Sequence, residues 1–186
     1  MRERLRLIAN FHCPKWDEIP DSGLLNAEVL DFINSNLSPI LTNEDRITKM
    51  MIQNYVKQGI VPKPTGRKYD RSQIAHLIVI VSYKQVLRME NIHKGIQLQV
   101  SLTGIEEAYA HFAKALDDAI DHYFQPILTG GDLVSERFDL REDNIGVVSI
   151  AHASALRLLG NMILECGGFK KLREYAQSLD SGDGES

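Results

Sequence analysis

Apolar residues recur at helical spacing along most of the chain, and this pattern predicts a mainly α-helical protein. The first helical pattern follows Asp21 and Ser22, either of which can cap a helix, and Ser38-Pro39 breaks it. Its apolar positions are Leu24, Leu25, Val29, Phe32, Ile33 and Leu37. We therefore expect an amphipathic helix over residues 24–37.

A short helix is expected next. Thr48 is a good N-cap for a helix from Lys49 to Gln58, and Gly59 is suited to end it. On a helical projection the inner side of this helix consists of Met51, Ile52, Tyr55 and Val56. The outer side consists of Lys49, Met50, Gln53, Asn54 and Lys57. The pattern thus predicts an outward face made largely of amides and lysines.

A non-helical segment separates this helix from a long one. Two prolines exclude a helix over residues 60–69, and Thr65-Gly66 is a turn signal, so we expect two short extended arms around a tight tip. Asp70 and Gln73 have the spacing of a capping box, which would open a long helix that reaches about Met89. Because this helix is apolar almost all round, we expect it to be the buried centre of its domain.

The rest of the chain predicts further helices. One covers residues 105–123 and is expected to stop at Pro126. An apolar stretch at residues 144–166 indicates a buried helix, and a short helix is expected over 169–179. The acidic tail, residues 180–186, is expected to be disordered.

The middle of the chain is basic, although the whole protein has a net charge of −4. Residues 42–94 contain ten basic and four acidic side chains, a net charge of +6. Residues 1–41 have a net charge of −2, and residues 95–186 have −8. Within the basic segment, residues 49–68 contain no Asp or Glu. This asymmetry is typical of contact with a polyanion, and the alternative is an ordinary solvated face.

The order of these elements is that of a winged helix-turn-helix. Residues 47–62, the sequence Gly66-Arg-Lys-Tyr69 and residues 71–77 resemble the DNA-binding domain of MerR-type regulators. The resemblance implies a MerR-like winged helix-turn-helix with a short β-hairpin wing over residues 1–95. The connection before the short helix is longer than the usual tight turn, and the C-terminal half lacks the long heptad helix of MerR dimers. Promoter untwisting of the MerR kind is therefore not part of the expectation.

A more specific resemblance is to an uncharacterised bacterial family, the domain of unknown function 1836. It rests on Pro14-Lys-Trp-Asp-Glu-Ile-Pro20, on residues 48–62, on Lys68-Tyr69 and on residues 74–86. These motifs cover most of residues 12–95. That family has no established activity, so the resemblance implies a fold and a class of protein without a mechanism.

The short helix and the loop after it supply the residue types that DNA recognition needs. Amide side chains can pair with adenine and a lysine can reach guanine, so the candidate base contacts are Lys49, Gln53 and Asn54. Cationic side chains suit phosphates, which give affinity without sequence information. The candidate phosphate contacts are Lys57, Lys63, Arg67, Lys68, Tyr55 and Tyr69. For the two tyrosines, a role as core aromatics remains an equal alternative.

One group of residues in the C-terminal half has the spacing of metal ligands. Glu107, His111, Asp118 and His122 lie on one stripe of the predicted helix, and carboxylates and imidazoles at such spacing can hold a metal between helices. The apolar residues of that helix centre near the opposite side, so we expect the stripe to face solvent. We predict no metal site.

Other catalytic signals are weak. His152 lies in an apolar stretch and is expected to be a core histidine with a hydrogen-bond partner. The two cysteines, Cys13 and Cys166, lack metal-site spacing and are expected to be free thiols. The sequence has no Gly-rich phosphate loop, nucleophile elbow or Cys/His pair. We therefore expect no enzymatic activity and no cofactor.

These inferences combine into one expectation. Residues 1–95 form the DNA-binding-like domain, residues 96–179 an acidic helical region for dimerisation or effector binding, and residues 180–186 the tail. We expect a DNA-binding transcriptional regulator that acts on double-stranded DNA as a homodimer, with an unknown small-molecule effector left open. No signal peptide or membrane span is evident, so we expect a cytoplasmic protein with no membrane partner. The alternative is a protein–protein interaction module that kept the winged fold without DNA binding.

Overall fold

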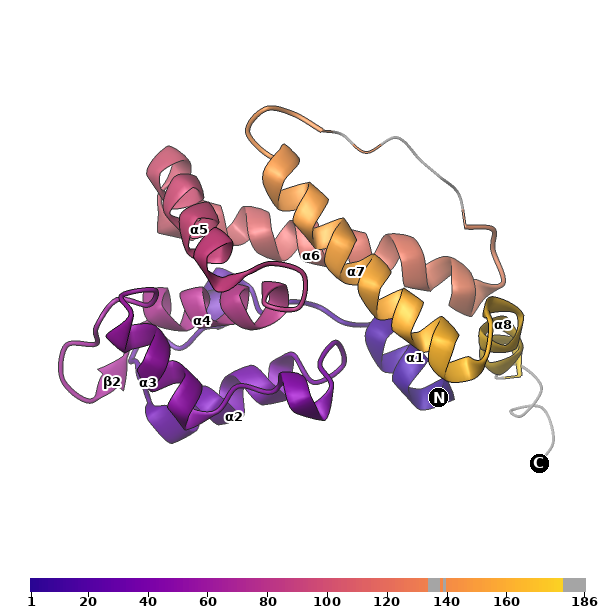
Figure 1. Cartoon of the computed structure of the whole chain (residues 1–186), viewed down its shortest axis with the longest axis horizontal. Helices are drawn as coiled ribbons and strands as arrows, with labels where there is room; N and C mark the ends of the chain where they lie inside the picture. The colour runs from indigo at the N-terminus through magenta and orange to yellow at the C-terminus, as the bar shows by residue number, and fades with distance from the viewer. Residues whose placement is uncertain (134–137, 139, 179–186) are drawn as a thin grey trace. The chain divides into compact units, whose positions relative to one another are not determined.

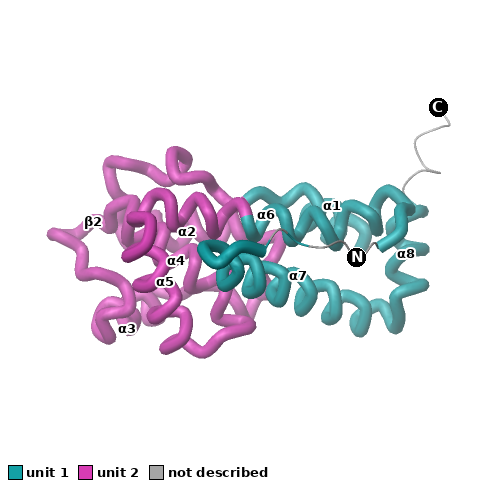
Figure 2. The backbone as a smooth tube through the Cα atoms, turned by 90° about the horizontal axis from the view of Figure 1, so that it is seen from above, with its two compact units in different colours: residues 1–12, 115–186 teal, residues 13–114 magenta. Residues whose placement is uncertain are grey.

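The computed structural model describes residues 1–133, 138 and 140–178, and these residues are mainly helical with one small antiparallel sheet. The expectation of a mainly α protein is confirmed. Contacts divide the chain into two compact units (Figure 2). Unit 2 is Cys13–Lys114, and unit 1 consists of Met1–His12 and Ala115–Ser186.

Unit 2 begins with an irregular segment that contains one 3₁₀ turn, Trp16–Glu18. This segment leads to strand β1, Leu24–Leu25 (Figure 1). Helix α2 is Asn26–Asn36, so it begins two residues later than the sequence pattern predicts. The first two apolar residues of that pattern are used in strand pairing instead. Neither Asp21 nor Ser22 caps the helix; the backbone N–H of Leu25 donates to Glu28 Oε2 at 2.6 Å.

The sheet pairs β1 with β2, Lys68–Tyr69, in antiparallel register, with Leu24 opposite Tyr69 and Leu25 opposite Lys68. The predicted hairpin within residues 60–69 is therefore wrong in its pairing. The first arm of that segment contains prolines, which lack the N–H donor that a strand ladder needs. Strand β2 pairs instead with the segment that enters α2, and this contact ties both ends of the 26–67 region together.

Gly23 makes the close approach of the two strands possible. It has φ +71°, a left-handed conformation that favours glycine, and a Cβ at this position would lie 3.0 Å from the carbonyl oxygen of Tyr69. A side chain here would therefore be strained by its own backbone and would also press on β2.

The next two helices begin where the sequence predicts. Helix α3 is Lys49–Lys57, and Thr48 Oγ1 accepts a hydrogen bond from the backbone N–H of Met51 at 3.3 Å. Helix α4 is Arg71–Tyr83. Its capping box is complete: Asp70 Oδ1 accepts from the N–H of Gln73 at 2.9 Å, and Gln73 Oε1 accepts from the N–H of Asp70 at 2.8 Å. Both predicted caps are confirmed.

Helix α4 is the buried centre of unit 2, as expected, but it is shorter than predicted. It ends at Tyr83, whose carbonyl accepts from the N–H groups of Val86 and Leu87 in a tight turn. The side chain of Gln85 in this turn donates to Asp45, which lies far away in sequence. A separate helix, α5, Met89–Thr103, follows.

Helix α6, Ile105–Thr129, continues through the predicted stop at Pro126. A proline inside a helix removes one backbone hydrogen bond and costs about 3 kcal/mol. The two large side chains beside it, Phe124 and Ile127, are fully buried, and burial of each contributes about 1.5–3 kcal/mol. Packing therefore outweighs the local penalty. Residues of α6 up to Lys114 belong to unit 2, and those from Ala115 belong to unit 1.

Unit 1 also contains α1, Arg2–Ala9, α7, Ile145–Cys166, and α8, Phe169–Gln177. Helix α8 contacts both α1 and α7. The apolar pattern of the sequence predicts α7 and α8 but no helix at α1. The C-terminal end of α7 is a left-handed Gly167, as expected for a helix stop, whereas residues 179–186 of the predicted last helix and tail lie outside the described residues.

The unit boundaries differ from those expected from sequence. The boundary proposed at residues 95 and 96 falls inside α5, and the first 12 residues belong to the same unit as the C-terminal helices.

Candidate nucleic-acid interface

The outward face of α3 is fully available to a partner. Its five predicted outer residues are exposed, and Ile52 and Tyr55 are buried on the opposite side. The two sides of this helix are therefore those that the sequence predicts. Met50, to which the sequence pattern assigns no role, is 71% exposed and lies among the candidate base contacts. The helical projection contained that signal, because it places Met50 on the outer side.

The loop after α3 is anchored at its start and exposed at its tip. The N–H groups of Ile60 and Val61 both donate to the carbonyl of Tyr55, at 2.9 and 3.2 Å, and both side chains are buried. The candidate cations Lys63 and Arg67 are exposed, and Gly66 between them has φ +90°. Figure 1 shows this loop, β2 and α3 at the same end of unit 2.

The candidate phosphate contacts Tyr55 and Tyr69 are buried. Tyr55 is 9% exposed and Tyr69 is 7% exposed. The hydroxyl of Tyr69 accepts a hydrogen bond from Asn26 Nδ2 at 3.5 Å, and burial raises the pKa of Tyr55. These observations favour the core-aromatic alternative for both residues.

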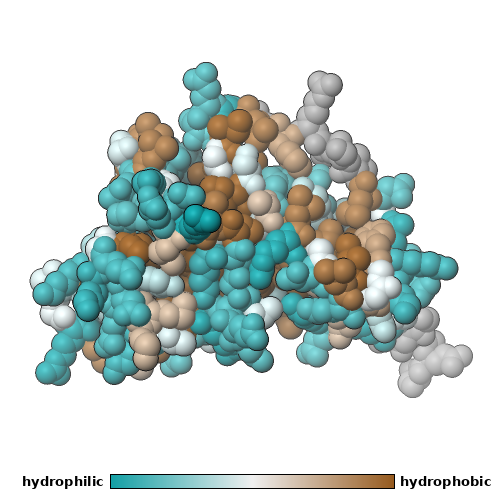
Figure 3. Space-filling model, viewed as in Figure 1, coloured by the Kyte–Doolittle hydropathy of each residue, from teal (hydrophilic) through white to brown (hydrophobic). Residues whose placement is uncertain are grey.

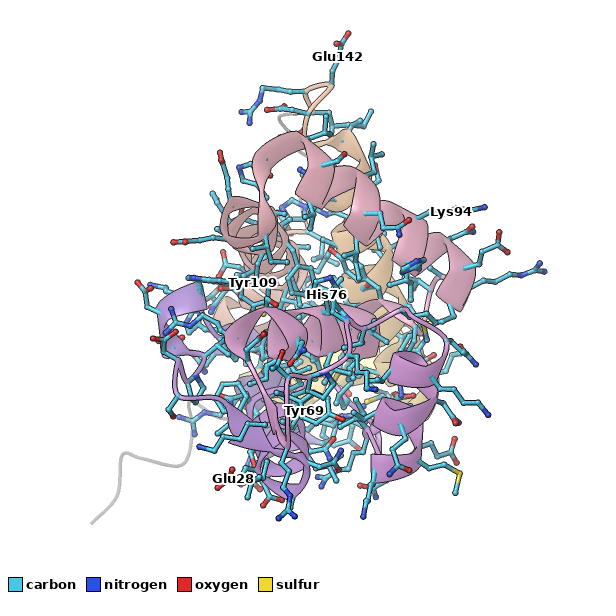
Figure 4. All side chains as sticks on the ribbon, turned by 90° about the vertical axis from the view of Figure 1, so that its left-hand side faces the viewer. Glu28, Tyr69, His76, Lys94, Tyr109 and Glu142 are labelled. Atoms are coloured by element: carbon cyan, nitrogen blue, oxygen red, sulfur yellow. The ribbon has the colours of Figure 1, made fainter. Side chains whose placement is uncertain are left out.

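Several basic residues of the middle segment have partners within unit 2. Arg71 donates to the carbonyl of Ile19 at 2.8 Å and lies over the ring of Trp16 at 5.7 Å. Lys94 pairs with Glu90 at 2.6 Å and extends away from α5 (Figure 4). Burial lowers the pKa of Lys84, and the nearby carboxylate of Asp45 opposes this shift. These three cations are used in holding unit 2 together or in pairing with its acids.

The candidate cations on α3 and the following loop differ from Arg71, Lys84 and Lys94 in their charge environment. Within the part of the chain that the structure describes, Lys49, Lys57, Lys63 and Arg67 form no ion pair with a carboxylate. Lys68 Nζ donates to the carbonyl of Ser22 at 3.4 Å and remains exposed. The end of unit 2 formed by α3 and the loop therefore presents uncompensated positive charge.

The histidine of α7 lies in a cluster of rings inside unit 1. His152 is buried and its Nδ1 lies 3.2 Å from the hydroxyl of Tyr123, which confirms the expected core histidine. Its ring centroid lies 5.9 Å from that of His122 and 3.8 Å from that of Phe138. Burial lowers the pKa of His152; the proximity of His122 adds to the shift, and Asp118 opposes it.

The predicted stripe on α6 does not assemble a metal site in the described residues. Glu107 and Asp118 are exposed, whereas His122 is half-buried in the ring cluster. Among residues 1–133, 138 and 140–178, no three His, Cys, Asp or Glu side chains lie close enough together to hold a metal ion. Both cysteines are free thiols, as expected.

Helix α7 exposes part of its apolar surface. Ile145, Leu156 and Leu164 are exposed, the last at 80%, and Figure 3 shows hydrophobic residues gathered over this helix. By length and composition α7 could cross a membrane, although a core helix of a soluble protein passes the same test. Its opposite side packs Ala151, Ala155 and other buried residues within unit 1.

Comparison with known proteins gives one match. No curated protein and no solved structure matches the chain. A family model described as Domain of unknown function (DUF1836) matches residues 14–112, which is more than half of the chain and coincides closely with unit 2. The motifs at residues 14–20, 48–62 and 74–86 lie inside this match. The chain belongs to the DUF1836 family.

Proposed function

We propose that this protein binds double-stranded DNA through α3 and the following loop, and that it acts as a transcriptional regulator. The observation that carries the proposal is the exposed, acid-free surface of residues 49–68, whose cations pair with no carboxylate in the described structure. A polyanion is the partner that such a surface attracts, and the phosphate backbone supplies most of the affinity in DNA complexes.

The arrangement of unit 2 supports a winged helix-turn-helix of the MerR kind. Helix α2 contacts both α3 and α4, and β2 contacts α2 and α4. In this hypothesis α2 is the supporting helix, α3 is the recognition helix, and the loop that ends in β2 is the wing. The connection between α2 and α3 contains a 3₁₀ turn, Asn43–Asp45, so it is longer than a minimal turn.

Each exposed residue then has a defined task. Gln53 and Asn54 can make bidentate hydrogen bonds to adenine N6 and N7, and Lys49 can reach guanine O6 and N7. A good bidentate pair contributes about 1–3 kcal/mol of discrimination. The cations Lys57, Lys63, Arg67 and Lys68 would contact phosphates and set the orientation of α3 without reading sequence.

The proposal includes a homodimer, a role for unit 1 and a cytoplasmic location. A homodimer would place two copies of α3 on two half-sites and so multiply a modest interface. The helices of unit 1 are the proposed place for dimerisation or for a small-molecule effector. A cytoplasmic location is consistent with this role.

Fluorescence anisotropy with random and genomic-neighbourhood duplexes at about 50–200 mM salt tests the proposal. Each phosphate contact contributes about 0.9 to the slope of log affinity against log salt, so four cations predict a slope of about −3.6. Arg67→Ala should weaken binding and reduce the slope by about 0.9, while Gln53→Ala should lose preference among sequences. Lys94→Ala removes the same charge from a lysine that pairs with Glu90, so it should leave the slope unchanged.

A second candidate function is a protein–protein interaction module. The observation that favours it is the exposed apolar side of α7, where Leu164 is 80% exposed. This candidate predicts a flat and weak salt response for every duplex. That result would contradict DNA binding and leave a protein partner as the hypothesis to pursue.

A further inference from the structure

An apolar side chain, Met50, shares the middle of the outward face of α3 with Lys57. Successive residues of an α-helix are about 100° apart, which places Met50 at about 100° and Lys57 at about 80° from Lys49. Gln53 and Asn54 then lie on either side, at about 40° and about 140°. Met50 and Lys57 therefore lie in the middle of the outward face, between the two amides.

The exposure of Met50 has no explanation in the packing of unit 2. At 71% it is the most exposed large hydrophobic side chain among the described residues of that unit. The next two, Leu98 and Leu102, are each 62% exposed and share a side of α5. Met50 instead lies among exposed polar neighbours, on a face that also bears Lys49 and Lys57. The positive charge and the lack of carboxylates make a nucleic acid the complementary occupant of this face.

We propose that Met50 is a specificity-determining residue that contacts the C5-methyl group of thymine in the major groove. The inference rests on the proposed function and adds to it a base preference. Residues at the N-terminal end of a recognition helix contact base edges, and Met50 is the second residue of α3. The thymine methyl is the one apolar group that a base pair presents in the major groove, and apolar side chains recognise it.

The position of Met50 on α3 also defines which neighbouring base pairs the helix contacts. With Met50 on thymine, Gln53 or Asn54 on the neighbouring side of the helix reaches an adjacent adenine. A thioether on a flexible, unbranched chain can adapt to the methyl group without a fixed pocket. The preferred half-site therefore contains an A·T pair read by Met50 next to a second A·T pair read by one of the amides.

Replacement of thymidine by deoxyuridine removes the C5-methyl group and leaves the base-pairing edge unchanged. The probe is a duplex enriched from a random library by the full-length wild-type protein, resynthesised with deoxyuridine at one thymidine position at a time. Loss of one buried methyl contact should weaken wild-type binding about three- to fivefold at one position per half-site. Met50→Ala should bind the thymidine duplex about as weakly as the wild type binds the substituted one, and it should not distinguish the two duplexes.

Leu98→Ala is the matched control. It removes an exposed apolar side chain of the same unit that lies outside α3, so it should retain the full thymidine preference. Because Met50 is exposed, the variant should fold, which its circular dichroism spectrum and urea midpoint would verify. Duplex binding with no effect of deoxyuridine at any position overturns the inference and leaves DNA binding intact. A deoxyuridine effect that persists in Met50→Ala overturns it as well. Absence of salt-dependent binding to any duplex overturns the proposed function itself, and the inference with it.

Discussion

Gly23→Ala tests the contact that joins the two strands of unit 2. The left-handed backbone of Gly23 would cost a non-glycine residue about 1–2 kcal/mol. In addition, the new Cβ would lie 3.0 Å from the carbonyl oxygen of Tyr69 and 3.3 Å from Cβ of Lys68, both on β2. Overpacking of this kind costs about 1–3 kcal/mol. The total expected loss in the free energy of unfolding is therefore about 2–5 kcal/mol.

Gly59→Ala separates the two contributions. Gly59 has the same φ of +71°, but a Cβ there would meet no atom within 4 Å. It should lose only the backbone component, about 1–2 kcal/mol. The difference between the two variants, about 1–3 kcal/mol, then measures the contact with β2 alone.

Urea unfolding followed by tryptophan fluorescence is the assay. Trp16 is the single tryptophan of the chain and lies in unit 2, where its ring contacts Tyr109 at a centroid distance of 5.9 Å. Its emission therefore reports on the unit that contains both glycines. With a slope of about 2 kcal/mol per molar urea, the midpoint of Gly23→Ala should lie about 0.5–1.5 M below that of Gly59→Ala. Equal midpoints would refute the argument that the approach of β1 to β2 needs glycine.

Two further predictions concern stability. Asp70→Ala removes the side-chain acceptor of the N–H of Gln73 and leaves the backbone half of the capping box, so it should lower the free energy of unfolding by about 1 kcal/mol in the same assay. Asp70→Asn keeps an acceptor and should lose less. Because burial holds the pKa of His152 below its unfolded value of about 6.5, the unfolded chain binds the proton first as pH falls. Stability from this residue should be fully present above about pH 6.5 and lost below it, and His152→Gln should flatten the profile measured by circular dichroism in urea between about pH 7.5 and 5.5. An unchanged profile in that variant would contradict the assigned role.

Local sequence signals were sufficient to predict the first residues of α3 and α4. Thr48 and the Asp70–Gln73 pair define the starts of α3 and α4 within the residues themselves, and the structure has both caps. The helical spacing of the apolar residues of α3 predicts which side faces the core, and Ile52 and Tyr55 are buried on that side. The geometry of the candidate interface on α3 was therefore predictable.

Features that depend on contacts between residues far apart in the sequence could not be predicted in this way. The end of α4 has neither proline nor glycine, and its turn is held partly by Gln85 and Asp45, 40 residues apart. The partner of β2 lies before α2, so nothing within residues 60–69 could identify it. Helix α5 contains Gly95 in its interior, and Ile92 is its one fully buried residue. Tertiary packing decided each of these cases.

The division of the chain into units has a consequence for the order of biosynthesis. Helix α1 is translated before unit 2, yet its buried residues Leu5 and Ile8 belong to unit 1, and α1 contacts α8 near the other end of the described chain. Arg4 pairs with Glu165 at 2.8 Å across the same separation. All of unit 2 leaves the ribosome before α8 does, so it can fold while α1 still lacks this partner. Helix α1 is thus synthesised before unit 2 but can pack against α8 only after it, so the nascent chain presents this side of α1 to chaperones until translation reaches α8.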